Sequence, residues 1–196
     1  MPGAFLWFIV FLLIVTSTGL LVSREWRWSI ALLAGQYAAA FWLVEQHWPL
    51  TMAAAKLVTG WMAAAVLGMT QINVKSYPAV ETSWPQGRTF RLFSAGLVLL
   101  AVFTVSPQMT GWLPGLELPN AAGALVLISL GLLHLGMTAN ALRVTLGLLT
   151  LLLGFETLYA TVENSVLVAG LLSAVTLGLA LTGSYLVTLT TAEDGA

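Results

Sequence analysis

Two ionisable side chains stand inside stretches of sequence that are otherwise suited to lipid. Glu156 lies in LLLGFETLYATV, and Lys56 lies in LTMAAAKLVTGW. A charged side chain near the centre of a bilayer costs roughly 2.5–3.5 kcal/mol on insertion scales. We therefore interpret Glu156 and Lys56 as candidate proton-relay residues, which exchange a proton or act as charge partners within a helix bundle.

Each of these residues also has a simpler interpretation. Glu156 can be a neutral carboxyl group that is hydrogen-bonded to a neighbouring helix, or a misplaced side chain facing lipid. Lys56 stands about four residues inside its apolar stretch, from where its long stem can reach the membrane surface. The sequence leaves open whether the two side chains meet.

The composition indicates which class of protein holds these residues. Of the 196 residues, 59% are hydrophobic and 8% are charged, whereas a soluble domain carries about 25% charged residues. Long apolar runs recur throughout, so we expect residues 1–196 to form a single integral membrane domain, an all-α polytopic bundle of transmembrane helices. Without cysteine, the chain has no disulfide, thiolate metal ligand or cysteine nucleophile. A net charge of −1 offers no basic surface, so we expect no nucleic-acid partner.

The apolar runs predict seven membrane spans and an orientation. The expected spans are 4–22, 28–44, 52–72, 91–105, 121–137, 144–161 and 166–188, of which the fourth is the shortest. Every proline falls in a connection or at a span end, so no helix should contain an internal proline. The bases other than Lys56 lie in or beside the first, third and fifth connections, which predicts an extracytoplasmic N-terminus and a cytoplasmic C-terminus in a bacterial-type inner membrane. Arg24, Arg27 and Arg143 are thus assigned to topology and to the membrane interface.

A weak internal repeat suggests a parallel duplication. RWSIALLA at 27–34 is similar to RVTLGLLT at 143–150, and 45–60 aligns with 163–178 at an offset of 118. We expect a first three-helix unit at 1–72, a connector with the fourth span at 73–119, and a second unit at 120–190. The third helix of each unit carries a stripe of small residues for close helix packing, within the chain or with a partner. These stripes are Gly60, Ala64 and Gly68, and Gly170, Ala174 and Gly178.

The sequence holds few other residues that could bind a metal or catalyse a reaction. His47 and His134 are isolated from carboxylates at ligand spacing, so we expect both at the membrane interface and no metal site. Tryptophans such as Trp48 fall near span ends, where aromatic rings settle at the interface. No phosphate-binding glycine loop or catalytic triad is present, so the chain has no enzyme active site of its own in its sequence.

The segment 131–186 resembles the K-type subunit of respiratory complex I. Gly154-Phe155-Glu156 matches the Gly-x-Glu of that family, Arg143 matches its basic loop, and Gly178-Leu179-Ala180-Leu181 matches its ending. The second glutamate of the family would fall at Ala174 and is missing here. With seven spans, the whole chain is similar to the membrane E component of hydrogenase-4 and formate-hydrogenlyase-type complexes, which also has a lysine comparable to Lys56.

This resemblance implies an integral subunit of a complex-I-like respiratory or hydrogenase assembly. Its partners would be antiporter-like membrane subunits and a membrane anchor subunit, within the lipid bilayer. Iron–sulfur clusters would lie in partner subunits, and none in this chain. Glu156 would contribute to the translocation of H⁺ or Na⁺ coupled to electron transfer in those partners.

Two other functions stay open from the sequence. A small-solute transporter with a 3+1+3 helix arrangement fits the span count and the parallel repeat. Against it, the span interiors hold few polar groups, among them Gln36. A purely structural membrane subunit, in which Glu156 only forms hydrogen bonds, fits as well.

Overall fold

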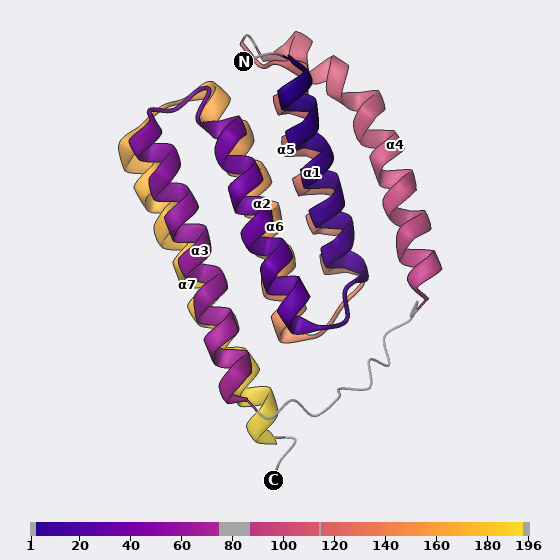
Figure 1. Cartoon of the computed structure of the whole chain (residues 1–196), viewed down its shortest axis with the longest axis vertical. Coiled ribbons are helices and arrows are strands. Elements are labelled where there is room, and N and C mark those ends of the chain that lie inside the picture. The colour runs from indigo at the N-terminus through magenta and orange to yellow at the C-terminus, as the bar shows by residue number, and fades with distance from the viewer. Residues whose placement is uncertain (1–2, 75–86, 114, 194–196) are drawn as a thin grey trace.

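The chain forms a bundle of long helices in this computed structural model, which describes residues 3–74, 87–113 and 115–193. Within these ranges the regular structure is helical throughout (Figure 1). The prediction of an all-α bundle of about seven spans is therefore confirmed. The helices are α1 (Gly3–Val22), α2 (Trp26–Val44), α3 (Leu50–Asn73), α4 (Arg88–Trp112), α5 (Leu118–Gly136), α6 (Ala141–Val162) and α7 (Val166–Glu193).

All of these helices except α2 are long and apolar enough to cross a membrane. α2 carries Arg27, Gln36 and Tyr37, and it packs against α1, α3 and α6, so that protein covers much of its surface. The outside of the bundle is rich in large apolar side chains, as a surface in contact with lipid requires. Examples that are more than half exposed are Phe8, Phe93, Leu100 and Leu167. The chain is a polytopic membrane protein.

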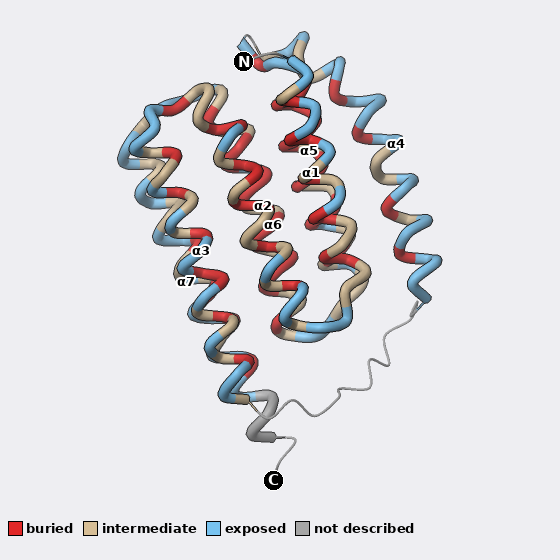
Figure 2. Tube along the Cα trace, in the orientation of Figure 1, coloured by how far each residue is buried: buried red, intermediate tan, exposed pale blue. Residues whose placement is uncertain are grey.

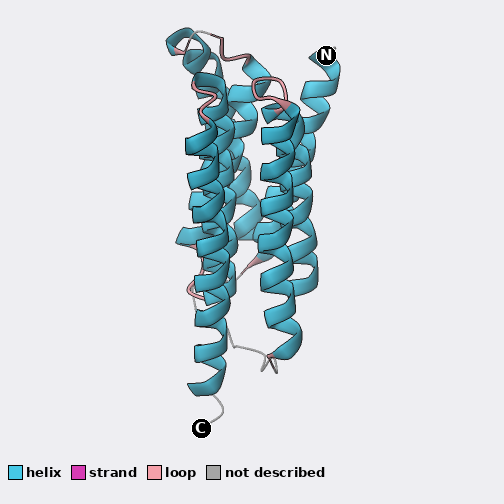
Figure 3. Cartoon of the chain, turned by 90° about the vertical axis from the view of Figure 1, so that its left-hand side faces the viewer, coloured by secondary structure: helices cyan, strands magenta, loops and turns pink. Residues whose placement is uncertain are grey.

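The helices form two layers that lie one on the other (Figures 1 and 3). One layer is α1, α2 and α3, and the other is α5, α6 and α7. α1 packs on α5, α2 on α6 and α3 on α7, and the two helices of each pair run in the same direction. α4 stands at the side of the bundle and packs mainly on α5. A parallel duplication with a connector helix would have this arrangement, although the duplication itself stays a prediction.

Burial is uneven between the helices. More than half of α5 and of α6 is buried, whereas most of α4 and α7 is exposed, as Figure 2 shows by residue. The exposed faces of α4 and α7 are apolar, so they lie against lipid or against a partner within the membrane.

α5 and α6 approach each other so closely that glycine is required between them. A Cβ atom at Gly154 would lie 2.8 Å from the backbone nitrogen of Ile128, and one at Gly131 would lie 2.8 Å from the backbone nitrogen of Leu151. Small residues allow helix backbones to touch in lipid, where packing drives association. This contact joins the first two helices of the second layer.

The two predicted small-residue stripes have different surroundings. In α3, Gly60 faces the ring of Tyr37, Ala64 is buried, and Gly68 makes an ordinary contact with Ile30. In α7, Gly170, Ala174 and Gly178 lie on the exposed face of the helix, and a Cβ at either glycine would meet nothing within 4 Å. The first stripe thus packs within the chain. For the second, contact with a partner is the predicted role that remains.

α4 differs from its prediction in length and in proline content. The fourth span was expected at 91–105 and without proline, but the helix has 25 residues and contains Pro107. Pro107 has no N–H to donate to the preceding turn. Hydroxyl groups bond to carbonyls on either side of it: Ser106 Oγ donates to the Val102 carbonyl at 2.6 Å, and Thr110 Oγ1 donates to the Pro107 carbonyl at 2.8 Å. The prediction of no internal proline is wrong, because α4 continues from Pro107 to Trp112. Membrane helices tolerate an internal proline where other groups or a local adjustment of the backbone make up for the missing N–H.

The described arginines gather at one end of the bundle, the lower end in Figure 1. This basic end comprises Arg24, Arg27, Arg88, Arg91 and Arg143. They lie at the end of α1 and the starts of α2, α4 and α6, so the predicted segregation of bases is present in three dimensions. Lys75 lies outside the described residues.

The glycine contact yields a stability prediction. We expect Gly154→Val to lower the free energy of unfolding by about 1–3 kcal/mol or more, because the new side chain would overlap the backbone of α5. Gly178→Val is the matched control, since the space at that position is open. Thermal unfolding of both variants in mild detergent measures the difference. Equal stability of the two variants would contradict the close packing of α5 on α6.

Candidate functional site

Lys56 and Glu156 form an ion pair inside the bundle. Lys56 Nζ of α3 contacts Glu156 Oε2 of α6. The Glu156 side chain is 0% exposed, and that of Lys56 is 8% exposed. The structure therefore answers the question that the sequence left open: the two candidate relay residues meet. Lys56 turns inward to this partner, so the alternative in which its ammonium group reaches the membrane surface is not realised.

The pair lies off the middle of α3 and α6, toward the end of the bundle opposite the arginines. Glu156 stands six residues before the end of α6, and Lys56 stands six residues after the start of α3. At 1.5 Å per residue, each lies about 9 Å along its helix from that end. The pair also joins the two layers, because α3 belongs to one and α6 to the other.

Tyr37 of α2 forms one wall of this site. The centre of its ring lies 5.8 Å from Lys56 Nζ, within the range of a cation–π contact. The ring fits there because residue 60 is glycine: a Cβ at Gly60 would overlap the ring atoms. Tyr37 is 1% exposed, and its hydroxyl group lies near Thr176 of α7. Helices α2, α3, α6 and α7 thus surround the ion pair.

One carboxylate oxygen of Glu156 is not engaged by the lysine. Oε1 is buried and has no hydrogen-bond partner among the described residues. The Tyr37 hydroxyl group likewise makes no hydrogen bond of good geometry within the described chain. Most buried polar atoms in proteins are satisfied. Atoms without such a partner also occur elsewhere in the described chain, for example at both ring nitrogens of His134. Chemically, the site holds a carboxylate that can still accept a proton or a hydrogen bond.

A second polar connection crosses the bundle next to this site. Gln36 Nε2 donates to Ser17 Oγ at 2.9 Å, and Thr150 Oγ1 donates to Gln36 Oε1 at 3.0 Å. This connection links α1, α2 and α6, and Gln36 is 0% exposed. Because Gln36 precedes Tyr37 directly, α2 presents one residue to each of the two polar clusters.

Sequence reasoning did not identify Tyr37, Ser17, Thr150 or Thr176 as part of the site. Hydroxyl-bearing residues are common in membrane helices and often bond to their own backbone, so they carry little signal individually. The adjacent pair Gln36-Tyr37, in the middle of an apolar span, is the feature that could have indicated them.

The arginines at the basic end separate into two groups. Arg143 Nη2 donates to the Ser23 carbonyl at 2.7 Å, and Arg91 Nη1 donates to the Leu21 carbonyl at 3.1 Å. These bonds satisfy carbonyl groups at the C-terminal end of α1, which have no partner within the helix. Arg24 and Arg27 are exposed, and Arg27 lies over the Trp26 ring at 5.4 Å. Arg143 therefore also holds α6 to α1.

Two residues expected at the membrane interface are covered by protein. His134 of α5 is 3% exposed and lies in the electrostatic range of Arg91 and Arg143. Trp48 is also 3% exposed, and its Nε1 donates to the Glu163 carbonyl at 2.9 Å. Both rings stand near helix ends, as expected, but protein covers them. Their position relative to the membrane interface stays a prediction. His47 is partly buried, and its Nδ1 lies 3.4 Å from Asn120 Nδ2.

Comparison of the chain with protein-family models, with curated proteins and with solved structures finds no match. The resemblance to complex-I-like subunits therefore depends on the sequence motifs alone.

The ion pair yields a second stability prediction. Removing one partner of a buried pair leaves an uncompensated charge and costs about 3–5 kcal/mol, whereas replacing both with apolar residues is often neutral. We expect Lys56→Met and Glu156→Met each to destabilise the chain by that amount and the double variant to recover most of the loss. Thermal unfolding of the four proteins in one detergent measures the coupling. Additive losses in the double variant would show that the two side chains do not interact.

Proposed function

We propose that this chain is an integral subunit of a complex-I-like respiratory or hydrogenase assembly, in which the Lys56–Glu156 pair takes part in translocating H⁺ or Na⁺. The observation that carries the proposal is the buried ion pair, in which one carboxylate oxygen of Glu156 is not engaged by the lysine. Ionisable residues inside membrane proteins typically mark ion pathways and proton relays. The Gly154-Phe155-Glu156 motif and the basic residue Arg143 add the family resemblance.

For protons, the pair can act as a two-state element. In one state it is ammonium and carboxylate; after a proton moves from Nζ to Oε2, it is amine and carboxylic acid. Uptake of a proton by the amine from one side, and release of the carboxyl proton to the other, restore the first state with one proton moved. Nearby charges shift such a balance strongly in a medium of low dielectric constant. Redox chemistry in partner subunits would supply the changing charge.

The proposed partners are antiporter-like membrane subunits and a membrane anchor subunit. The exposed apolar faces of α4 and α7, including the stripe Gly170, Ala174 and Gly178, offer surface for them. The iron–sulfur clusters of such an assembly would lie in its other subunits, since this chain has no cysteine. We place the basic end on the cytoplasmic side of a bacterial-type inner membrane, which puts the N-terminus outside and the C-terminus inside.

A small-solute transporter of the 3+1+3 type is the second candidate. The stacking of two three-helix layers in the same direction, with α4 outside them, favours it. Against it, the space between the layers is filled by packed side chains. A Cβ at Gly123 of α5, for example, would lie 2.6 Å from Leu43 of α2. A purely structural role, in which the ion pair only holds the layers together, is the third candidate.

Co-purification is the first test of the assembly. A C-terminal tag and extraction in mild detergent should bring down antiporter-like membrane subunits together with iron–sulfur proteins, identified by mass spectrometry. A lone chain or a homo-oligomer would overturn the proposal. Solute uptake by the isolated chain in liposomes would then favour the transporter.

Variants of the pair test its role within the assembled complex. We expect the double variant Lys56→Met, Glu156→Met to assemble but to lower coupled ion translocation at least about tenfold, because a relay group is removed without leaving a buried charge. Glu156→Gln should show the same loss. Glu163→Gln, at an exposed glutamate between α6 and α7, is the matched control. Unchanged translocation in a fully assembled double variant would favour the structural role.

A further inference from the structure

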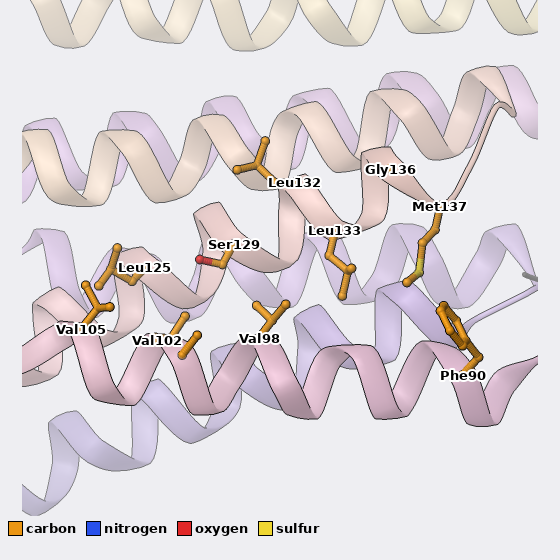
Figure 4. A pocket seen from close by; sticks show the side chains of 11 residues that line it. Phe90, Val98, Val102, Val105, Leu125, Ser129, Leu132, Leu133, Gly136 and Met137 are labelled. Atoms are coloured by element: carbon orange, nitrogen blue, oxygen red, sulfur yellow. The ribbon is translucent and has the colours of Figure 1, made fainter.

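An apolar groove runs between α4 and α5 on the outside of the bundle. It encloses about 680 Å³ and extends from Phe90 and Met137 near the basic end to Val105 and Leu125 (Figure 4). Ser129 is the single hydroxyl-bearing residue in its lining, and the rest of the lining is apolar. Phe90 and Val105 are each more than 40% exposed, so the groove opens toward the membrane.

The length of the groove suits an extended occupant. Phe90 and Val105, which both line it, are fifteen residues apart on α4, so the groove is about 22 Å long at 1.5 Å per residue. An acyl chain that enters at the basic end would follow this length, and one leaflet of a bilayer core is about 15 Å deep.

The charges around the groove favour an acidic headgroup. Its Phe90 and Met137 end lies at the basic end of the bundle, where Arg88, the first residue of α4, is exposed. Among the described residues, five arginines and two acidic residues, Glu25 and Glu193, lie at that end, so basic residues outnumber acidic ones there. Basic residues at a membrane surface attract the headgroups of anionic lipids. Arg88 stands two residues before Phe90, where a lipid headgroup would lie if its chain followed the groove.

We propose that the α4–α5 groove binds one acidic phospholipid, with an acyl chain along the groove and the phosphate paired with Arg88. The site is separate from the Lys56–Glu156 pair and does not depend on its function. The bound lipid would fill the space beside α4. The contacts of α4 with the rest of the chain are mainly those with α5.

Gly136 provides a variant that fills the groove without disturbing the fold. It lines the groove, and a Cβ at this position would meet nothing within 4 Å. Gly136→Leu should therefore occupy the space near Met137 that the acyl chain takes. Gly96 of α4 is equally open but lies outside the lining, so Gly96→Leu is the matched control.

The experiment is native mass spectrometry of the full chain, taken from vesicles of equal phosphatidylglycerol and phosphatidylethanolamine. We expect the unmodified chain and Gly96→Leu to retain one phosphatidylglycerol, and Gly136→Leu to retain about fivefold less. Arg88→Gln should still retain a lipid but should lose the preference for phosphatidylglycerol. Equal retention by Gly136→Leu and Gly96→Leu would overturn the groove as the site. Retention of both lipids alike by the unmodified chain would overturn the role of charge.

Discussion

A bilayer core contains no water to solvate a charge, so each ionised group within it must find its compensation in protein. This constraint explains why Lys56 and Glu156 lie together. The bond joins α3 of one layer to α6 of the other, and the wall of the site comes from α2 and α7. The position of four helices is thus tied to a single charge pair. Gly60 serves the same arrangement, since it leaves room for the Tyr37 ring beside the lysine.

Close packing between helices also holds the bundle together. The layers meet helix on helix, and α5 and α6 touch through Gly131 and Gly154. Such contacts matter more in lipid than in water, because burial of apolar surface supplies no driving force there. The hydrogen bonds that join Ser17, Gln36 and Thr150 also specify which faces of α1, α2 and α6 meet, because no water competes for them inside the bundle.

Much of the fold follows from the sequence, and the site follows only in part. The spans are readable because each must hold enough apolar residues to cross the bilayer. Glu156 stands out because a carboxylate in such a run is costly. Whether Lys56 turns inward was not readable, because its flexible stem can reach either environment and the outcome depends on α2 and α6, which are distant in sequence. The same holds for His134 and Trp48, whose burial depends on which helix lies opposite. Pro107 was expected at a helix end but lies inside α4, because one missing backbone N–H does not by itself end a long membrane helix.

Both ends of the bundle are fastened across the layers. At one end Trp48 is bonded to the Glu163 carbonyl, and at the other Arg143 is bonded to the Ser23 carbonyl. Separating the two layers at either end would break the bond at that end, at a cost of about 0.5–3 kcal/mol. A rotamer change of Lys56, Glu156 or Tyr37 inside the bundle breaks neither bond. The central site can therefore rearrange locally while both ends of the bundle stay joined.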